Sequence, residues 1–301
     1  MTLQLLRNIS LMVELPIFLA LDGPREPNDE FQQDQLISAI RSSGLQVSVV
    51  IGKENRGCAR GVVNSIDALF RISNSTIGIV LEDDCWPTIS FFDFVQENAS
   101  KLVRDWLTIT GQSVGSNPDG SLTFSSYPLI HGWAISRKNW DEVLQNVMNS
   151  KHARFQKDIP WKMKKFFERT ISKVDTGYLD TWDSHFTYAS WRLSQLSACK
   201  MNATVLNVGE MSSRDPKAVK HINQLKPASS SIFQNYQMDI YLERLFFGVT
   251  YSRALLWAFL NQFNAFLRFF KQRKLTLGQR IRLDLESPTD ERYYRVDLSN
   301  G

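Results

Sequence analysis

Short apolar runs alternate with longer amphipathic stretches over the first 210 residues of the chain. The runs at 16–21, 46–51 and 77–81 have strand length, and each is followed by polar or turn-forming residues. The stretches at 29–43 and 62–71 place apolar side chains on one side of a helix. Such alternation is typical of an α/β protein, and we expect a mostly parallel sheet flanked by helices.

The pattern begins with a helix and continues less regularly to residue 208. Leu3, Leu6, Ile9 and Val13 form a helical stripe that predicts a helix over 3–12. The further elements that we expect are helices at 91–104, 138–149 and 180–196 and strands at 106–110, 133–136 and 203–208. Polar loops are expected at 52–61 and 112–127, and an irregular basic segment between 151 and 175.

The alternation stops after about residue 210, which predicts a domain over 1–210 and a helical extension over 211–301. The segment Tyr241–Lys274 is rich in Phe, Leu and Trp, but polar residues interrupt it and make a membrane-spanning helix a poor fit. Two interpretations remain. The segment is a helical hairpin packed on the domain, which we favour, or an amphipathic surface that contacts anionic lipid.

Composition and charge narrow the class of protein. The chain has 301 residues, of which 43% are hydrophobic and 22% charged, with a net charge of +4. These values are ordinary for a soluble globular protein, and the charge is too small to indicate a nucleic-acid partner. The three cysteines are spread apart, and the first residues lack the features of a signal peptide. We therefore expect a cytoplasmic protein, with contact to the inner face of the membrane only under the lipid interpretation.

Three consecutive acids, Glu82, Asp83 and Asp84, directly follow the apolar run at 77–81. Carboxylates this close repel one another unless a cation or hydrogen-bond donors neutralise them. Their oxygens suit Mn²⁺ or Mg²⁺, and ligand sites in α/β sheets lie at the carboxyl ends of strands. The alternative is a solvated acidic turn before a helix near Ser90, stabilised by the helix dipole.

Four motifs in sequence order resemble those of GT-A-type glycosyltransferases, in particular bacterial proteins related to N-acetylglucosaminyltransferase I. They are Ala20–Arg25, Glu54–Gly61, Ile79–Asp84 and Gly132-Trp133. The resemblance covers about residues 1–210 and implies a nucleotide-binding α/β fold. It also implies transfer of a sugar from a nucleoside diphosphate donor to an acceptor hydroxyl, as in bacterial polysaccharide synthesis, with inversion and usually with Mn²⁺.

The resemblance also implies roles for the acids. Asp84 is expected to bind the metal, Glu82 to support it, and Asp83 to face the ribose or sugar. The general base is expected at Asp183, with Asp180 as the second candidate, because a Trp-Asp motif occurs at this stage of the chain. The alternative for both is a structural one, since acids in a first helical turn often serve as caps.

The remaining candidates are residues that could bind substrate. Asp22 could accept a hydrogen bond from a ribose or base, or form only an Asx turn. Arg60 could meet phosphate, although solvation of Arg60 in an ordinary loop is an equal alternative. Arg25, in the motif Ala20–Arg25, is a further candidate for binding substrate. Gly132 and Trp133 match the acceptor-side loop of the family, where an aromatic ring stacks on a sugar. A buried core tryptophan is the rival interpretation of Trp133.

One departure from the family pattern bears on activity. Family members begin with a further strand that supplies part of the nucleotide pocket, whereas this sequence opens in what looks like the next helix. We expect either a missing strand encoded upstream or a truncated, weakly active or inactive protein. A sugar-phosphate nucleotidyltransferase, which shares this sheet, remains the other enzymatic alternative.

Overall fold

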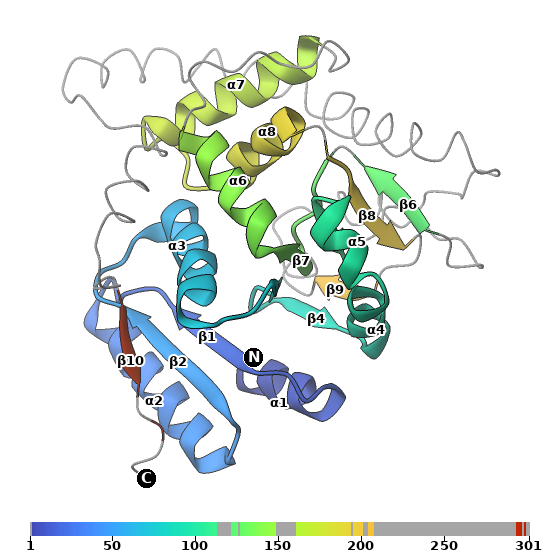
Figure 1. Ribbon diagram of the computed structural model, residues 1–301. Helices are drawn as coiled ribbons and strands as arrows, with labels where there is room; N and C mark the ends of the chain where they lie inside the picture. The colour runs from blue at the N-terminus through green and yellow to red at the C-terminus, as the bar shows by residue number, and fades with distance from the viewer. Residues whose placement is uncertain are drawn as a thin grey trace.

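The first half of the chain alternates helices and strands as the sequence pattern predicts, and the whole is a mixed α/β fold (Figure 1). The computed structural model describes residues 2–112, 122–125, 127–148, 161–193, 195–200, 204–207, 293–296 and 298. Within them lie eight helices and ten strands, the strands forming three sheets. The α/β class is thereby confirmed.

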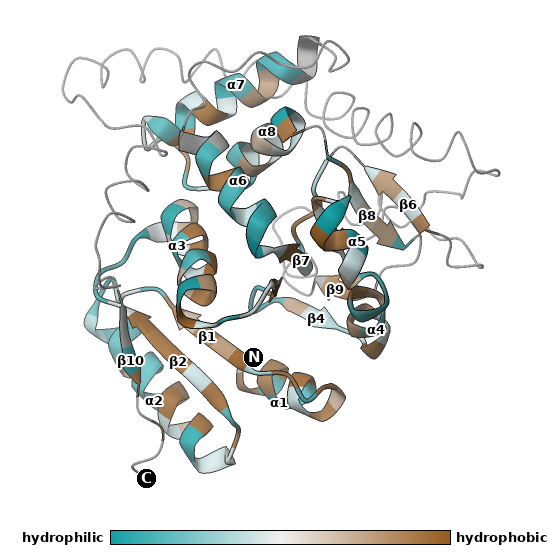
Figure 2. Ribbon diagram, in the orientation of Figure 1, coloured by the Kyte–Doolittle hydropathy of each residue, from teal (hydrophilic) through white to brown (hydrophobic). Residues whose placement is uncertain are grey.

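The N-terminal part forms a small sheet covered by two helices. Helix α1 (Thr2–Met12) leads into β1 (Ile17–Leu21), and α2 (Pro27–Ser43) leads into β2 (Val47–Gly52). The two strands pair in parallel, with Ile17 opposite Val47 and Leu21 opposite Ile51. Both strands are predominantly hydrophobic (Figure 2), and β2 packs with α1 and α2 in one apolar cluster.

Helix α3 (Gly57–Ile72) then carries the chain to the larger sheet, whose strand order is β3-β7-β5-β8-β6. Its strands are β3 (Ile77–Val80), β5 (Thr108–Thr110), β6 (Leu122–Ser125), β7 (Trp133–Ser136) and β8 (Ser197–Lys200). A separate two-stranded ribbon joins β4 (Cys85–Pro87) and β9 (Val205–Asn207). The remaining helices are α4 (Ile89–Glu97), α5 (Ala99–Arg104), α6 (Arg137–Met148), α7 (Trp161–Asp175) and α8 (Asp183–Leu193).

The expectation of a mostly parallel sheet is wrong for the strands that the structure describes. Only β1–β2 and β5–β8 are parallel among the seven strand pairs. Strand β7 lies between β3 and β5 and runs antiparallel to both. Hydrophobic periodicity reports which residues form strands, but it carries no information on strand direction, so the sequence pattern left this point open.

Several element boundaries also differ from those expected. Helix α3 begins at Gly57, inside the segment expected to be a loop, and α7 occupies much of the segment expected to be irregular. Strand β6 lies within the expected loop at 112–127. The helix expected over 91–104 is divided into α4 and α5 at Asn98. These differences arise where contacts with distant residues, rather than local periodicity, decide the conformation.

The C-terminal part was expected to be a helical extension over 211–301, and the few residues of it that the structure describes include a strand. Strand β10 (Tyr293–Val296) pairs antiparallel with β2, from Tyr293 opposite Gly52 to Val296 opposite Val49. The end of the chain therefore belongs to the sheet of the N-terminal part. The segment Tyr241–Lys274, for which a hairpin or a lipid surface was expected, lies outside the described residues.

None of the helices in the described part of the chain has the length and hydropathy needed to cross a membrane.

Candidate functional site

A cavity of about 880 Å³ lies where β1, β3 and the start of α3 come together. This volume is within the range of ligand pockets. Its inner wall is apolar, and its rim carries Asp22, Gly23, Arg25, Asp29, Asn55, Gly57, Cys58, Glu82, Asp83 and Asp180. After β2 the chain passes through α3 to β3, which is the end strand of the other sheet. The carboxyl ends of strands are where open α/β sheets bind ligands.

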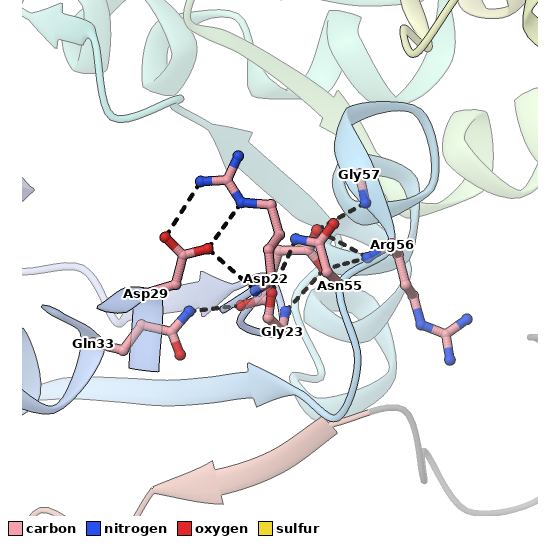
Figure 3. A network of polar contacts seen from close by, with 8 residues as sticks. Asp22, Gly23, Asp29, Gln33, Asn55, Arg56 and Gly57 are labelled. Atoms are coloured by element: carbon pink, nitrogen blue, oxygen red, sulfur yellow. Dashed lines mark hydrogen bonds and ion pairs between the residues drawn. The ribbon is translucent and has the colours of Figure 1, made fainter. Parts of the chain in front are cut away.

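Asp22 fastens the carboxyl end of β1 to the loop that precedes α3 (Figure 3). Its Oδ1 accepts hydrogen bonds from the backbone N–H groups of Gly23 and Arg56, each at 3.0 Å. Its Oδ2 accepts from Arg56 N at 3.0 Å and from Gly57 N at 2.9 Å. A carboxylate has about four sites that can accept hydrogen bonds, and these four contacts occupy them. The structure thus places Asp22 as an anchor of the loop.

Two side-chain amides, which the sequence reasoning missed, complete this anchor. Asn55 Nδ2 donates to the carbonyl of Gly23 at 2.9 Å, and Gln33 Nε2 donates to the carbonyl of Asp22 at 2.8 Å. Both residues look like ordinary surface amides in the sequence, because the carbonyls that they meet belong to a turn 32 and 11 residues away. Only the nearby Asp22-Gly23 pair signalled that a tight turn would need such support.

Arg25, expected to bind substrate, lies on the cavity rim and pairs with Asp29. Its Nε donates to Asp29 Oδ2 at 2.8 Å, and this hydrogen bond raises the pKa of Arg25 and lowers that of Asp29. The arginine side chain is 71% exposed. Because exposed pairs are weakly held, Arg25 remains able to turn toward an anion in the cavity.

Asp180 caps α3 from a distant part of the chain. Its Oδ2 accepts from Cys58 N at 2.8 Å and its Oδ1 from Ala59 N at 2.7 Å. The residue at the N-cap position of α3, Arg56, makes no such side-chain bond. Gly57 has a φ of +72°, and a Cβ there would overlap the Asp180 carboxylate. The structural alternative for Asp180, a helix cap, is therefore confirmed, although the helix that it caps is α3.

The expected acid cluster forms a tight turn after β3. Cys85 N donates to the carbonyl of Glu82 at 2.9 Å, so Asp83 and Asp84 occupy the tip of this turn. Burial, followed in decreasing order by the neighbouring carboxylates of Asp84, Asp83 and Asp183, raises the pKa of Glu82 to about 7. The negative groups are thus close enough to repel one another, as the sequence predicted.

Asp183, the expected general base, is the first residue of α8 and is half-buried. Its Oδ1 accepts from Thr181 Oγ1 at 2.7 Å and from Ser184 N at 2.6 Å. Within the part of the chain that the structure describes, its Oδ2 makes no hydrogen bond. Its charge reaches both Glu82 and Cys58, which shows that it lies near the acid turn. One oxygen thus orients the carboxylate while the other is left for a ligand.

The pKa of the Cys58 thiol shows that the rim is strongly negative. Burial raises the pKa of this thiol to about 11, together with the charges of Glu82, Asp180, Asp183 and Asp22. A thiol with this pKa is a weak nucleophile at neutral pH. The four acids come from three separate segments of the chain, so the fold concentrates negative charge at this place.

Trp133 does not face the site, and its expected role in stacking on a sugar is wrong. Its side chain is 0% exposed and packs against Trp182, Phe186 and Trp140, with ring centroids at 5.6, 5.0 and 6.5 Å. A Cβ at Gly132, which has a φ of +70°, would overlap Val205. The rival interpretation of Trp133 as a core tryptophan is confirmed. Gly132 and Trp133 belong to the packing that holds α8 in place.

Arg60, expected to meet phosphate, is not among the residues that line the cavity. The lining stripe of α3 is Gly57, Cys58, Gly61, Val62, Ser65, Ile66 and Leu69. Arg60 lies in the same helix beside this stripe and is half-buried. Its expected contact with a donor in the cavity therefore has no support from its position.

The side chains at the cavity rim provide some, but not all, of the ligands that a divalent cation needs. Within the described residues, no three His, Cys, Asp or Glu side chains converge as a ready-made metal site. Mg²⁺ and Mn²⁺ are commonly held by one or two carboxylates together with substrate phosphates. Crowded oxygens at Glu82, Asp83 and Asp84 fit that second kind of site.

Removing the Asp180 cap should weaken α3. We expect Asp180→Ala to lower the free energy of unfolding by about 1–2 kcal/mol, because two amide groups lose their acceptor. Urea unfolding measures the change, and hydrogen exchange at Cys58 and Ala59 locates it. Asp34→Ala, at an exposed acid in α2, is the matched control and should stay within about 0.5 kcal/mol. Equal stability of the two variants would contradict the capping role.

Glu82 should make stability fall as pH rises. Its pKa in the folded protein, about 7, exceeds the ordinary value of 4.5, so the folded state binds more protons between these values. The stabilising effect of its proton is complete below pH 4.5 and lost above about 7. Glu82→Gln should remove this decline, measured as urea midpoints between these pH limits. Glu97→Gln, at an exposed glutamate of α4, should keep it.

A comparison with protein-family models and a search of curated proteins both find no match for this chain. The comparisons therefore assign no family, and the function has to be argued from the site. The protein has a mixed α/β fold, a cavity lined by the end strands β1 and β3 of two sheets, and acids from several segments at the rim of this cavity.

Proposed function

We propose that the protein is a metal-dependent glycosyltransferase that moves a sugar from a nucleoside diphosphate donor to an acceptor hydroxyl. The observation that carries this proposal is the acid turn of Glu82, Asp83 and Asp84 at the carboxyl end of β3. Glu82 and Asp83 line the cavity, and Asp183 lies close enough to raise the pKa of Glu82. A hydroxyl-activating carboxylate thus lies beside a group of potential metal ligands.

The charge of the rim supports the need for a cation. A diphosphate would be repelled by the acids that surround Cys58. The N-terminus of α3, a natural anion site, is already occupied by the Asp180 carboxylate. A divalent ion held by Asp84 with support from Glu82 would supply positive charge to stabilise the departing nucleoside diphosphate. Among the described residues that line the cavity, Arg25 is the cation that could add to it.

The chain's own residues then have distinct tasks. The acceptor oxygen attacks the anomeric carbon, the bond from that carbon to the phosphate oxygen breaks, and the diphosphate leaves with the electron pair. Oδ2 of Asp183 takes the proton of the acceptor hydroxyl, while Oδ1 keeps its bonds to Thr181 and Ser184. Direct displacement of this kind inverts the anomeric centre. Asp83, exposed at the tip of the turn, faces the ribose or sugar.

A panel of nucleotide sugars, incubated with and without Mn²⁺, tests the proposed reaction. We expect Mn²⁺-dependent release of nucleoside diphosphate from one donor. Release of pyrophosphate from a sugar phosphate and a nucleoside triphosphate would instead show a nucleotidyltransferase. Absence of both reactions, together with no metal-dependent heat on titration with UDP or GDP, would overturn the proposal.

Asp84→Ala should abolish Mn²⁺-dependent binding of nucleotide, because the cation loses its principal ligand. The fold should be retained or become slightly more stable, since the change relieves repulsion within the acid turn. Calorimetry with UDP or GDP and Mn²⁺ measures the binding. Asp93→Ala, at an exposed acid of α4, is the control and should bind as the parent does. Unchanged affinity in Asp84→Ala would show that the metal lies elsewhere.

Asp183→Asn should leave donor affinity within about 2-fold and lower turnover by roughly 100-fold or more. The amide oxygen still accepts the hydrogen bonds from Thr181 and Ser184, so the change removes only the ability to take a proton. Donor binding is measured by calorimetry and turnover by release of nucleoside diphosphate. A parallel loss of binding and turnover would instead show that Asp183 holds the donor.

A further inference from the structure

We propose that His185 and Asp175 are a pair of positioning residues, whose contact fixes the loop on which both Asp180 and Asp183 lie. The pair joins the end of α7 to the first turn of α8, and the loop between these helices reaches the cavity rim at Asp180. Neither member is among the described residues that line the cavity, so the pair acts through the acids of the loop. The part of the inference that concerns turnover rests on the proposed function, whereas the hold of Asp180 on α3 does not.

The pair is a buried contact between two helix ends. His185 Nε2 lies 3.2 Å from Asp175 Oδ1, and the histidine side chain is 3% exposed. Asp175 is the last residue of α7, and its side chain is 20% exposed. A hydrogen bond is stronger away from water, and a buried group that loses its partner is left unsatisfied. The contact therefore resists any shift between the end of α7 and the start of α8, two helices that pack together (Figure 1).

The surroundings of His185 assign the direction of this hydrogen bond. Its Nδ1 is buried and has no hydrogen-bond partner within the described part of the chain. A hydrogen on Nδ1 alone would be an unpaired buried donor, and the lone pair of Nε2 would then face a carboxylate oxygen. Nε2 therefore carries a hydrogen and donates it to Asp175. His185→Gln and Asp175→Asn each keep a group that can make the same bond.

The loop that follows α7 turns sharply at a glycine. Gly177, with a φ of +73°, donates its N–H to the carbonyl of Val174 at 2.9 Å, and Tyr178 N donates to the carbonyl of Lys173 at 2.8 Å. These two bonds form a Schellman motif, which ends a helix at a left-handed glycine. The positioning pair closes the loop, since its members lie ten positions apart. Loops of about 6–16 residues whose ends meet are compact units, so this loop is expected to move as one piece.

The loop carries two acids that act near the start of α3. Asp180 accepts hydrogen bonds from Cys58 N at 2.8 Å and from Ala59 N at 2.7 Å. Asp183 lies close enough to Cys58 to raise the pKa of its thiol. A displacement of the loop therefore changes the positions of both acids together.

Asp183 depends on its helix for its position. The described hydrogen bonds of its carboxylate are local, to Thr181 and Ser184. They orient the carboxylate on α8, but they do not place α8 relative to α3. The position of Asp183 at the cavity rim is consequently set by whatever holds the first turn of α8.

The histidine supplies to this turn what apolar packing does not. Phe186 packs against Trp133 and Trp182, with ring centroids at 5.0 and 5.3 Å. Such packing fixes how deeply α8 lies in the core, but it is non-directional. The bond of His185, one residue earlier, has a preferred direction toward α7 and restricts rotation of α8 about its axis. Asp183, in the same turn, is thereby held in one orientation toward the acid turn.

The test removes the bond in the full chain and asks whether the acids of the loop lose their positions. His185→Met keeps an adaptable apolar side chain but removes the donor. His185→Gln retains an N–H that can reach Asp175. Thr187→Val is the matched control, because it removes a buried hydroxyl from the same helix and leaves both members of the pair in place.

We expect His185→Met to speed amide exchange at Cys58 and Ala59 by roughly 5-fold or more, because Asp180 holds these N–H groups less tightly. Turnover should fall by roughly 10-fold, since the base is misplaced, while affinity for UDP or GDP with Mn²⁺ stays within about 2-fold. His185→Gln and Thr187→Val should stay within about 2-fold of the parent in all three measurements.

Asp175→Ala tests the pair from its more exposed member, where a substitution carries less risk to folding. It should reproduce the faster exchange at 58 and 59, whereas Asp175→Asn, whose amide oxygen can accept the bond, should not. Unchanged exchange in both His185→Met and Asp175→Ala would overturn the proposal. Equal changes in Thr187→Val would also overturn it, because the effect would then follow from lower stability alone. The same holds if His185→Gln behaves as His185→Met does, since the ring and not the bond would then matter.

The exchange measurement needs no substrate, so it separates this inference from the proposed function. Faster exchange in His185→Met, in a protein whose parent releases no nucleoside diphosphate, would support the positioning pair and contradict the proposed function. Faster exchange with unchanged turnover, in a parent that is active, would show that the pair does not place Asp183, and this result would overturn the inference while the proposed function stands.

Discussion

The site depends on how two carboxylates meet backbone amides at the start of α3. Asp22, at the end of β1, and Asp180, before α8, accept hydrogen bonds from successive N–H groups between Arg56 and Ala59. One short segment is thereby fixed to two parts of the chain that are far apart in sequence. The positive end of the helix dipole favours both carboxylates, which allows negative charge to gather here without unfolding the turn.

The same constraint shapes what the cavity can bind. Asp22 and Asp180 are committed to amides, and Asp29 is paired with Arg25. The other described acids that line the cavity are Glu82 and Asp83, with Asp84 and Asp183 close to Glu82. Their mutual repulsion is visible in the raised pKa of Glu82, to about 7. A divalent cation relieves this repulsion and can also hold a diphosphate. The electrostatic balance of the site therefore favours an anionic ligand that arrives with a metal.

The hydrophobic pattern and the local motifs located the strands and the acid turn, but they did not predict the contacts between distant segments that hold these elements together. The pattern predicted β1, β2, β3 and β7 within one residue at most positions, because buried strands leave short apolar runs. It placed the start of α3 several residues late, because the acceptor for its first amides is Asp180. The sequence pattern also placed Trp133 at the site. The local sequence Gly-Trp is the same whether the ring contacts a sugar or packs against Trp182.

The sequence by itself determined the α/β class, the crowding of Glu82, Asp83 and Asp84, and the amphipathic helix predicted at 3–12, because these follow from neighbours along the chain. Tertiary structure alone decided the strand directions, the pairing of Tyr293–Val296 with β2, the commitment of Asp22 and Asp180 to amides, and the cleft between β1 and β3. The physical reason is that hydrogen bonds between distant segments, and the edges that they leave open, depend on which elements pack together, and no local pattern records that choice.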